Sequence, residues 1–270
     1  MTGIHRSWLF VPGDRPERFA KAAAAGADAV ILDLEDAVAP AAKDAAREHV
    51  RQWLQAGNQA YLRINSPEGS WFEQDLSLAS LAAGIILPKA EHGSDIARVM
   101  QAGAQSVLPL IETAQGMWLA HTLASQPGVL RLVFGTIDFN LDMGIEGEDE
   151  QLLYFRSQLV LASKVAGIQP PVDGVTTAFD DEEVIRHDTL RGKRLGFGGK
   201  LCIHPRQVPT VNACFAPSAA EVEWARQVEQ AAQSSGGAAV SLNGKMIDRP
   251  VILKAQEILR ESQRPASRTR

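Results

Sequence analysis

Two short apolar runs in this sequence each end in an acidic residue, and these acids are the first candidates for chemistry. Residues 107–111 lead into Glu112, and residues 132–137 lead into Asp138. An apolar run bounded by turn residues is typical of a strand that is buried on both faces. A carboxylate at the end of such a strand is costly to bury unless a partner or a metal offsets its charge. We therefore interpret Glu112 and Asp138 as a pair that shares one hard cation.

Polar side chains follow most of the other apolar runs as well. This wider set consists of Asp33, Glu35, Asp36, Arg63, Asn65, Lys89, Asp173 and His204. Each member alone is also explained as a helix N-cap or a solvated loop residue, and we favour that interpretation for Asp173, which precedes a glycine. His204 is equally explained as a core histidine. If the strands run parallel, the set as a whole indicates one polar mouth.

Magnesium fits the predicted acidic pair best, because it prefers oxygen ligands, needs few of them from the protein and keeps several waters. Zinc is disfavoured, since no two of the 6 histidines lie within one helical turn of each other. Arg63 is the candidate for binding a substrate carboxylate, because a guanidinium can donate two parallel hydrogen bonds to it. Gly135 and Thr136, just before Asp138, are expected to offer backbone N–H groups to an anion.

Strands must alternate with helices to bring these side chains together, and the sequence predicts this order. The expected strands are residues 7–11, 29–32, 60–65, 84–87, 107–111, 132–137, 169–172 and 199–203. Strands separated by helical segments imply right-handed crossovers and a parallel sheet. Roughly eight such units match an α/β fold of the closed (β/α)8 TIM barrel type. The alternative is an open doubly wound sheet, but its glycine fingerprint is missing after the first strand.

We divide the chain into a barrel of residues 1–215 and a C-terminal helical extension of residues 216–270. The extension has one predicted helix at 219–234, a tight-turn signal at Asn243–Gly244, a second helix to about residue 261 and an end that looks frayed from about Gln263. It is too small for a core of its own. We therefore expect it to pack on the barrel or on a neighbouring subunit.

The overall composition narrows the function classes. The chain has 270 residues, 45% of them hydrophobic, and a net charge of −5 at pH 7, so a nucleic-acid surface is not indicated. No apolar run is long enough to predict a membrane span. With no export signal and no metal-ligand spacing at Cys202 and Cys214, we expect free thiols in a reducing cytoplasm. No Walker loop or serine elbow is present.

Seven segments, in this order along the chain, resemble the citrate lyase β-subunit family. They are RSWLFVPG at 6–13, DLEDAV at 33–38, RIN at 63–65, LPK at 87–89, IET at 111–113, GTID at 135–138 and CIHP at 202–205. This family belongs to the HpcH/HpaI aldolase superfamily and includes malyl-CoA and citramalyl-CoA lyases. The similarity extends from about residue 6 to residue 260.

The resemblance implies a (β/α)8 barrel, usually assembled as a homotrimer, with Mg²⁺ held by Glu112 and Asp138. It assigns the family's carboxylate-binding arginine to Arg63. The acidic pair that follows the second strand of the family corresponds to Glu35 and Asp36, near the waters of the metal.

In the malyl-CoA lyase branch, an acid of the C-terminal tail reaches a neighbouring subunit's site as acid/base. The segment MIDRP at 246–250 is similar to that tail, so Asp248 is the candidate. The predicted catalytic residues are thus Arg63, Asp36 and Asp248, and the predicted substrate-binding residues are Arg63, Glu35, Gly135 and Thr136. The chain lacks the extensions of the larger malyl-CoA lyases. The resemblance therefore does not decide which carrier holds the thioester, coenzyme A or an acyl carrier protein.

The implied reaction is the reversible cleavage of a 3-hydroxyacyl thioester that carries a carboxylate, of the malyl-CoA, citramalyl-CoA or citryl type. Its products are a 2-keto acid and an acyl thioester, of coenzyme A or of an acyl carrier protein. Four alternatives stay open at this point. They are a class II aldolase of free 2-keto acids, a citrate lyase β subunit that needs an acyl carrier protein, a non-catalytic partner-dependent subunit, and a thioesterase.

Overall fold

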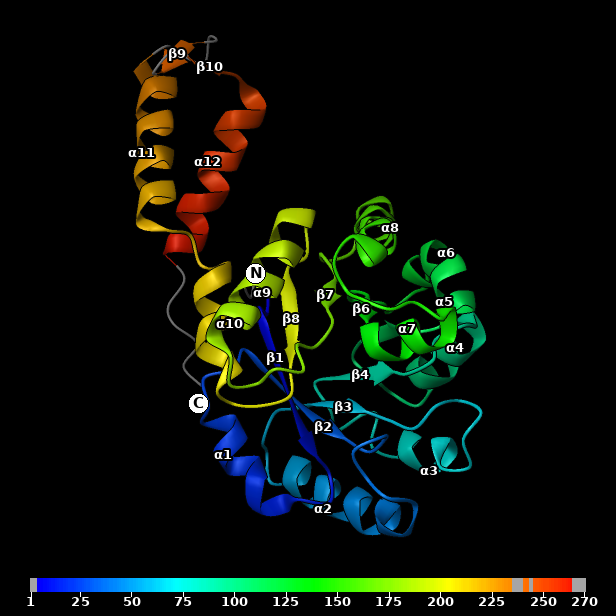
Figure 1. Ribbon diagram of the computed structural model, residues 1–270. Coiled ribbons are helices and arrows are strands. Elements are labelled where there is room, and N and C mark those ends of the chain that lie inside the picture. The colour runs from blue at the N-terminus through cyan, green and yellow to red at the C-terminus, as the bar shows by residue number, and fades with distance from the viewer. Residues whose placement is uncertain (1–3, 235–239, 243–244, 264–270) are drawn as a thin grey trace.

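The computed structural model describes residues 4–234, 240–242 and 245–263, and within them eight parallel strands close into one barrel (Figure 1). The strands are β1 (Ser7–Pro12), β2 (Ala29–Asp33), β3 (Tyr61–Arg63), β4 (Gly84–Leu87), β5 (Val107–Ile111), β6 (Val133–Phe134), β7 (Val172–Asp173) and β8 (Gly199–Cys202). They pair in chain order, and β8 pairs back onto β1. The predicted (β/α)8 TIM barrel is confirmed, and the open doubly wound sheet is excluded.

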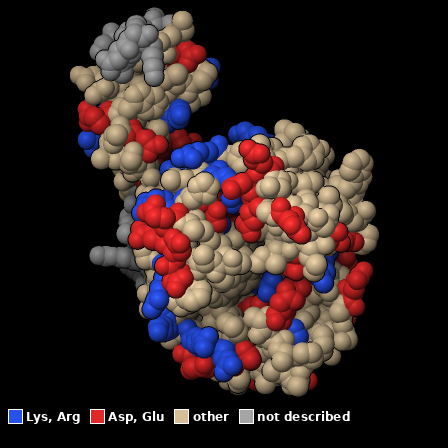
Figure 2. Space-filling model, viewed as in Figure 1, with Lys and Arg blue, Asp and Glu red and all other residues tan. Residues whose placement is uncertain are grey.

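Helices surround this barrel on its outer side (Figure 1). They are α1 (Phe19–Ala23), α2 (Lys43–Gln55), α3 (Phe72–Leu76), α4 (Gly93–Gln101), α5 (Ala114–Trp118), α6 (Ala120–Ala124), α7 (Thr136–Met143), α8 (Leu153–Val165), α9 (Glu182–Leu195) and α10 (Gln207–Phe215). Short 3₁₀ turns at Pro16–Arg18, Pro40–Ala42 and Glu150–Leu152 precede three of them. On the face in Figure 2, acidic and basic side chains are interspersed.

Helix α7 corrects one predicted strand. Residues 132–137 were expected to be extended, but β6 ends at Phe134, where its pairing with Ile111 of β5 also ends. Gly135 then takes the N-cap position, and the helix runs to an αL cap at Gly144. Asp138 therefore lies in the first turn of a helix, not at the end of a strand.

Two cores follow from the period of two in the strands. One set of strand side chains fills the barrel interior and includes Ile31, Tyr61, Leu110, Val172 and Leu201. The residues between them face outward and pack under the helices, in a cluster that includes Leu32, Leu62, Ile111 and Cys202. The residue two positions after an interior side chain at the end of a strand therefore points into the mouth of the barrel.

The C-terminal extension forms a helical hairpin of α11 (Ala219–Ser234) and α12 (Arg249–Ser262), joined through the antiparallel strands β9 (Val240–Leu242) and β10 (Lys245–Ile247). Figure 1 shows this hairpin standing away from the barrel. It buries a small cluster of its own, so the expectation that the extension has no core is wrong. Among the described residues of the hairpin, the buried members of this cluster are Ala225, Val228, Ile247 and Ala255.

The division at residue 215 stays a prediction. The expected turn at Asn243–Gly244 lies outside the described residues, as does the expected frayed end beyond Gln263. Within the described part of the chain, no helix combines the length and apolarity that crossing a membrane requires.

Candidate active site

Strand register brings the central residues of the site together. Asp33 and Arg63 are paired positions at the ends of β2 and β3, and each lies two residues beyond an interior side chain. Glu112 likewise lies two residues beyond Leu110, an interior residue of β5. Because successive side chains alternate, all three side chains belong to the inward-facing rows at the C-terminal ends of the strands.

Glu112 is a buried carboxylate, 2% exposed. Its Oε1 accepts a hydrogen bond of 2.8 Å from the backbone N–H of Lys89. Burial raises the pKa of Glu112 well above its ordinary value, and the nearby carboxylates of Glu35 and Asp138 raise it further, against this hydrogen bond and the charge of Arg63. A positive charge placed beside Glu112 would relieve this penalty.

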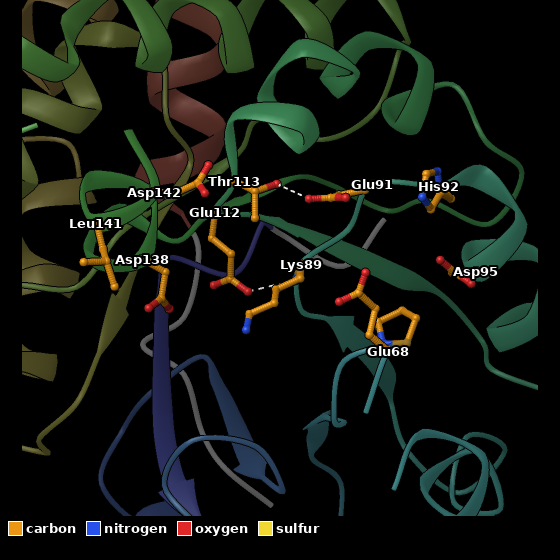
Figure 3. A pocket seen from close by; sticks show the side chains of 11 residues that line it. Glu68, Lys89, Glu91, His92, Asp95, Glu112, Thr113, Asp138, Leu141 and Asp142 are labelled. Atoms are coloured by element: carbon orange, nitrogen blue, oxygen red, sulfur yellow. Dashed lines mark hydrogen bonds between the residues drawn. The ribbon is translucent and has the colours of Figure 1, made fainter. Parts of the chain in front are cut away.

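Asp138 lies beside Glu112, with its carboxylate on the same side (Figure 3). The two acids line two neighbouring pockets together, one of about 350 Å³ and one of about 500 Å³. The smaller pocket also contains Lys89 and His92. The lining of the larger pocket combines the charged residues Asp33, Asp36 and Arg63 with several apolar residues. The expected acidic pair is thus brought to one wall between two pockets.

The guanidinium of Arg63 forms hydrogen bonds with Asp33 of the same chain. Its Nε and Nη2 donate to the two oxygens of Asp33 at 2.7 and 2.6 Å, and its guanidinium lies 4.8 Å from the ring of Phe10. Arg63 also lines the larger pocket, so its predicted role in binding a substrate carboxylate stays a prediction, and the structure adds that Asp33 holds two of its nitrogens. Sequence analysis placed Asp33 among the strand ends but missed this pairing.

The third nitrogen of Arg63 faces the predicted acidic pair. Nη1 lies 3.1 Å from Glu35 and 3.5 Å from Asp36. Glu35 is buried and is not among the residues that line the two pockets, whereas Asp36 is exposed and lines the larger one. Burial, together with the charges of Asp36 and Asp33, raises the pKa of Glu35 to about 8, although Arg63 opposes the shift.

Gly135 and Thr136 contribute differently from what the sequence suggested. The N–H of Gly135 donates to the carbonyl of Ile111 at 2.9 Å, so the expectation that it binds an anion is wrong. A Cβ at Gly135 would lie 2.6 Å from both Cβ and Oε2 of Glu112, so only glycine fits there. Thr136 lines the larger pocket, and its buried hydroxyl has no hydrogen-bond partner among the described residues.

Lys89 adopts a left-handed backbone conformation with φ of 45°. Among the described residues other than glycine, no other has a positive φ. Such a conformation costs of the order of 1 kcal/mol or more in a residue with a side chain. It is the conformation in which the Lys89 N–H reaches Glu112, so local strain is coupled to the position of the central acid.

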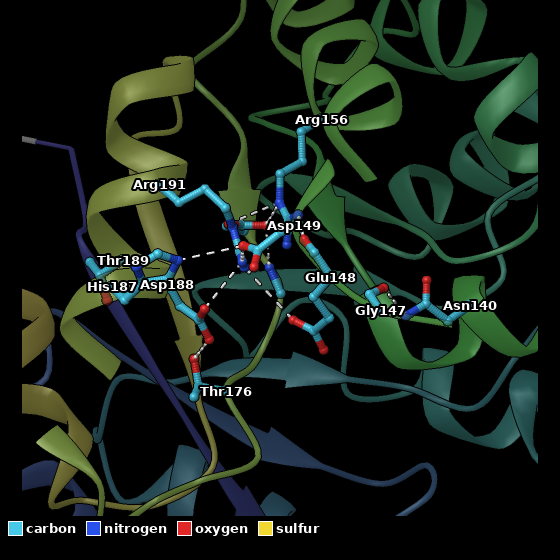
Figure 4. Close-up of polar contacts among 12 residues, drawn as sticks. Asn140, Gly147, Glu148, Asp149, Arg156, Thr176, His187, Asp188, Thr189 and Arg191 are labelled. Atoms are coloured by element: carbon cyan, nitrogen blue, oxygen red, sulfur yellow. Dashed lines mark hydrogen bonds and ion pairs between the residues drawn. The ribbon is translucent and has the colours of Figure 1, made fainter. Parts of the chain in front are cut away.

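Asp173 and His204 belong to the set of residues at the predicted strand ends, but neither lines the pockets that contain Glu112. Asp173 is an outward-facing residue that pairs with Arg156 at 3.0 Å, and both are about 1% exposed. Arg156 also donates to the carbonyl of Glu148, within a set of polar contacts that includes Asp149 and Arg191 (Figure 4). His204 packs against Phe179 with ring centroids 5.0 Å apart, outside both pockets that contain Glu112.

Asp248 is not brought to the other site residues within one chain. It is exposed at the N-cap of α12, where its carboxylate accepts a hydrogen bond of 3.3 Å from the N–H of Val251. The hairpin that carries it stands away from the barrel (Figure 1). Any role of Asp248 in the site therefore requires the tail of another copy.

The donor set fits a hard divalent cation. No group of three or more His, Cys, Asp or Glu side chains within residues 4–234, 240–242 and 245–263 forms a complete metal cage. Two carboxylates with open pocket on both sides are what Mg²⁺ uses when water and substrate supply the other ligands. The burial penalty on Glu112 gives this fit a physical reason.

Comparison with known proteins agrees with the fold. The family model "HpcH/HpaI aldolase/citrate lyase" matches residues 6–205. A citrate lyase subunit beta-like protein of Deinococcus radiodurans is 36% identical over 94% of this chain and 96% of its own length. A (3S)-malyl-CoA thioesterase of Cereibacter sphaeroides is 35% identical over 96% of this chain and 94% of its own.

A solved structure is similar over nearly the whole chain. It is the CitE protein of Mycobacterium tuberculosis in complex with magnesium, acetoacetate and coenzyme A. The two share 33% identity with a TM-score of 0.85, covering 98% of this chain and 100% of that one. The similarity therefore includes the C-terminal hairpin as well as the barrel.

Proposed function

The chain belongs to the HpcH/HpaI aldolase/citrate lyase family, and from this premise we propose that it is a Mg²⁺-dependent carbon–carbon lyase. Its substrate is a 3-hydroxyacyl thioester with a carboxylate next to the hydroxyl-bearing carbon, of the malyl, citramalyl or citryl type. Cleavage gives a small 2-keto acid and an acyl thioester, and the reverse reaction joins them. The observation that carries this proposal is the shared wall of Glu112 and Asp138 between two pockets at the mouth of the barrel.

Glu112 and Asp138 are the residues that would hold the cation. When bound, Mg²⁺ supplies positive charge to the hydroxyl and carboxylate oxygens of the substrate, which favours the alkoxide needed for cleavage. The magnesium in the related CitE structure of M. tuberculosis supports this assignment.

The walls of the larger pocket orient the substrate. Arg63 lines this pocket while Asp33 holds its Nε and Nη2, so the arginine offsets negative charge from a fixed position. The lining also includes apolar side chains, among them Leu110 and Val175, which limit the access of water to the carbon that becomes nucleophilic.

Two proton transfers are needed. Cleavage removes the proton of the 3-hydroxyl, breaks the bond between C2 and C3, and returns a proton to C2 of the acyl thioester. We assign the first transfer to Asp36, an exposed carboxylate that lines the larger pocket, acting directly or through a water. We assign the second to Asp248 of the partner subunit, since in its own chain Asp248 lies far from the mouth, and this assignment needs the predicted homotrimer.

The proposal is tested by assaying the purified chain with a panel of acyl-CoA thioesters. Malyl-CoA and citramalyl-CoA are each incubated with and without Mg²⁺, and the keto acid and the acyl-CoA are quantified separately. We expect both products in equal amounts with Mg²⁺ and none after the metal is chelated. Turnover that needs only a free 2-keto acid substrate would instead identify an aldolase.

A thioesterase is the second candidate, because the C. sphaeroides relative with 35% identity is a (3S)-malyl-CoA thioesterase. The same assay distinguishes the two, since hydrolysis yields free coenzyme A and malate without a keto acid. If neither reaction occurs with coenzyme A thioesters, repeating the panel with an acyl carrier protein thioester tests the citrate lyase β-subunit alternative.

A further inference from the structure

Helix α2 buries charge where an amphipathic helix normally buries apolar side chains. Its buried stripe is Lys43, Ala46, Arg47, Val50 and Leu54. Lysine is rarely buried unless its ammonium group is fully hydrogen-bonded. The two cations in this stripe therefore need partners on the barrel side of the helix.

Lys43 finds three acceptors at the mouth. Its Nζ donates at 2.7 Å to the backbone carbonyls of Leu34 and Glu35 and at 2.7 Å to Oδ1 of Asn65. The ring of Trp71 lies 5.2 Å from the same atom. All three ammonium hydrogens are thus used, and two of them hold the backbone of the acidic loop that follows β2.

Asn65 is held in turn by a second buried pair. Its backbone N–H and its Nδ2 donate to Oδ2 of Asp75 at 2.9 and 2.6 Å. The other oxygen of Asp75, which is 0% exposed, accepts from Nε of Arg47 at 2.8 Å. A continuous chain of hydrogen bonds thus runs from α2 through α3 to the end of β3.

The acidic loop is fixed from its other side as well. Besides binding Arg63, Asp33 accepts from the N–H groups of Glu35 and Ala37 at 2.9 and 3.2 Å. The loop amides are therefore held by Asp33, and the preceding carbonyls by Lys43. The two sets of bonds together fix where Glu35 meets Nη1 of Arg63.

We propose that Lys43 is a positioning residue, which holds the loop from Leu34 to Ala37 so that its acids keep the guanidinium of Arg63 in place at the wall where the keto acid binds. This inference rests on the proposed function in one respect, since it assumes that the larger pocket binds the keto acid. Lys43 itself does not line that pocket. It acts through the loop carbonyls and Asn65.

The experiment compares Lys43→Met with Arg131→Met. Methionine keeps the apolar stem and removes the donors in both cases. Arg131 is a matched control, because it is also fully buried and donates to two backbone carbonyls, those of His5 and Pro171, which lie before β1 and β7 at the opposite end of the barrel. Both variants lose a buried cation, but only one loses it at the mouth.

Hydrogen exchange at the Glu35 and Ala37 amides is measured first, in metal-free protein. We expect at least about 10-fold faster exchange at these two amides in Lys43→Met and wild-type rates there in Arg131→Met. Unchanged exchange in Lys43→Met would overturn the proposal, as would an equal increase in Arg131→Met. If Lys43→Met does not fold, Lys43→Gln keeps part of the donor set and is measured in the same way.

Kinetics then separates positioning from a purely structural role. We expect KM for the keto acid to rise by about 10- to 100-fold in Lys43→Met, because small displacements of a binding group are costly, with a smaller change in kcat. A structural role would lower the active fraction, and hence kcat, at unchanged KM, and that result would refute the inference.

The binding measurement also keeps the two proposals separate. If wild-type protein turns over no thioester, the proposed function fails, and the affinity for pyruvate with Mg²⁺ is measured by calorimetry in place of KM. Weaker pyruvate binding in Lys43→Met than in Arg131→Met supports the positioning role. Equal affinities contradict it.

Discussion

Two sides of the barrel are built from the same three kinds of side chain: an aspartate that ends a strand, an arginine that pairs with it, and a buried lysine that donates to the carbonyls of the following loop. On the β2–β3 side these are Asp33, Arg63 and Lys43. This group lies next to a pocket of about 500 Å³, which Asp33 and Arg63 help to line.

On the β7–β8 side the corresponding residues are Asp173, Arg156 and Lys200. Nζ of Lys200 donates to the carbonyl of Gly174 at 2.7 Å, as Lys43 does to its loop. The polar contacts continue outward from this group (Figure 4), where Thr176 donates to Asp188 at 2.6 Å. Asp173, Arg156 and Lys200 are 1–2% exposed, and none of them lines either pocket that contains Glu112.

The difference comes from the period of two along each strand. Asp33 lies two residues after the interior residue Ile31, whereas Asp173 directly follows the interior residue Val172. One aspartate therefore points into the mouth and the other points under the helices. Composition alone does not separate a reactive group from a structural one, because access to a pocket decides it.

The β7–β8 side, whose charged residues are buried away from both pockets that contain Glu112, should contribute more to stability than the β2–β3 side. Asp173→Ala leaves Arg156 buried without its anion, and we expect a loss of about 3–5 kcal/mol in the free energy of unfolding, measured by urea denaturation. The double variant Asp173→Leu with Arg156→Met removes both charges and should regain much of this loss. A loss below about 1 kcal/mol in the single variant would mean that the two sides do not differ in this way.

The β2–β3 side and the neighbouring Glu112, which line the larger pocket, should contribute more to catalysis than the β7–β8 side. Glu112→Gln removes a charge at nearly constant shape, and we expect kcat/KM to fall by more than the roughly 100-fold typical of losing an outer partner of a metal ligand. The same variant should melt at a higher temperature in metal-free protein, since burial penalises the charged carboxylate. Glu68→Gln, in the smaller pocket with Glu112, serves as the control, and near wild-type activity of Glu112→Gln would contradict the assignment.

A smaller effect should follow from crowding Glu112. Gly135→Ala places a methyl group 2.6 Å from two atoms of Glu112, so we expect kcat/KM to fall by about 10- to 100-fold as the carboxylate is displaced. Gly93→Ala is the matched control, because its methyl group would meet the amide end of the Gln126 side chain. Equal activities of the two variants would show that this close approach has no catalytic consequence.

The smallest expected effect, taken per pH unit, is a pH dependence of the stability of the β2–β3 side. The pKa of Glu35 is raised from 4.5 to about 8 in the folded protein, so between these values the folded state binds more protons than the unfolded state. Stability due to Glu35 is therefore present below pH 4.5 and is lost up to about pH 8, by at most about 1.4 kcal/mol per pH unit. Urea denaturation of metal-free wild type and Glu35→Gln should show a gap that widens over this range, and a constant gap would refute it.

The order of strands and helices was readable because it depends on local pattern. Apolar runs bounded by turn residues predicted every strand of the barrel, and the acids Glu112 and Asp138 were placed on the mouth. The period of two also predicts that Asp173 points outward. A position at the end of a strand does not show this, because successive side chains point to opposite faces. Helix α7 was missed because an apolar run of six residues does not distinguish a strand from a strand followed by a helix.

The burial of Lys43 and Arg47 is harder to predict from the sequence than the order of the strands and helices. Lys43 and Arg47 occupy positions of the apolar stripe of α2, and a charged residue in such a stripe indicates a buried polar partner. The partner itself could not be read, since Asp75 lies 28 residues beyond Arg47 and on another helix.

Local patterns in the chain were thus enough to predict the barrel and the acids at its mouth, because alternation and chain order are properties of neighbouring residues. The three-dimensional structure was needed to show that Arg63 holds Asp33, that Lys43 holds the acidic loop, and that Asp248 lies far from the mouth of its own barrel. Those outcomes depend on the register between strands and on how helices pack against them. Both are set by contacts between residues that are distant in sequence, so no local pattern encodes them.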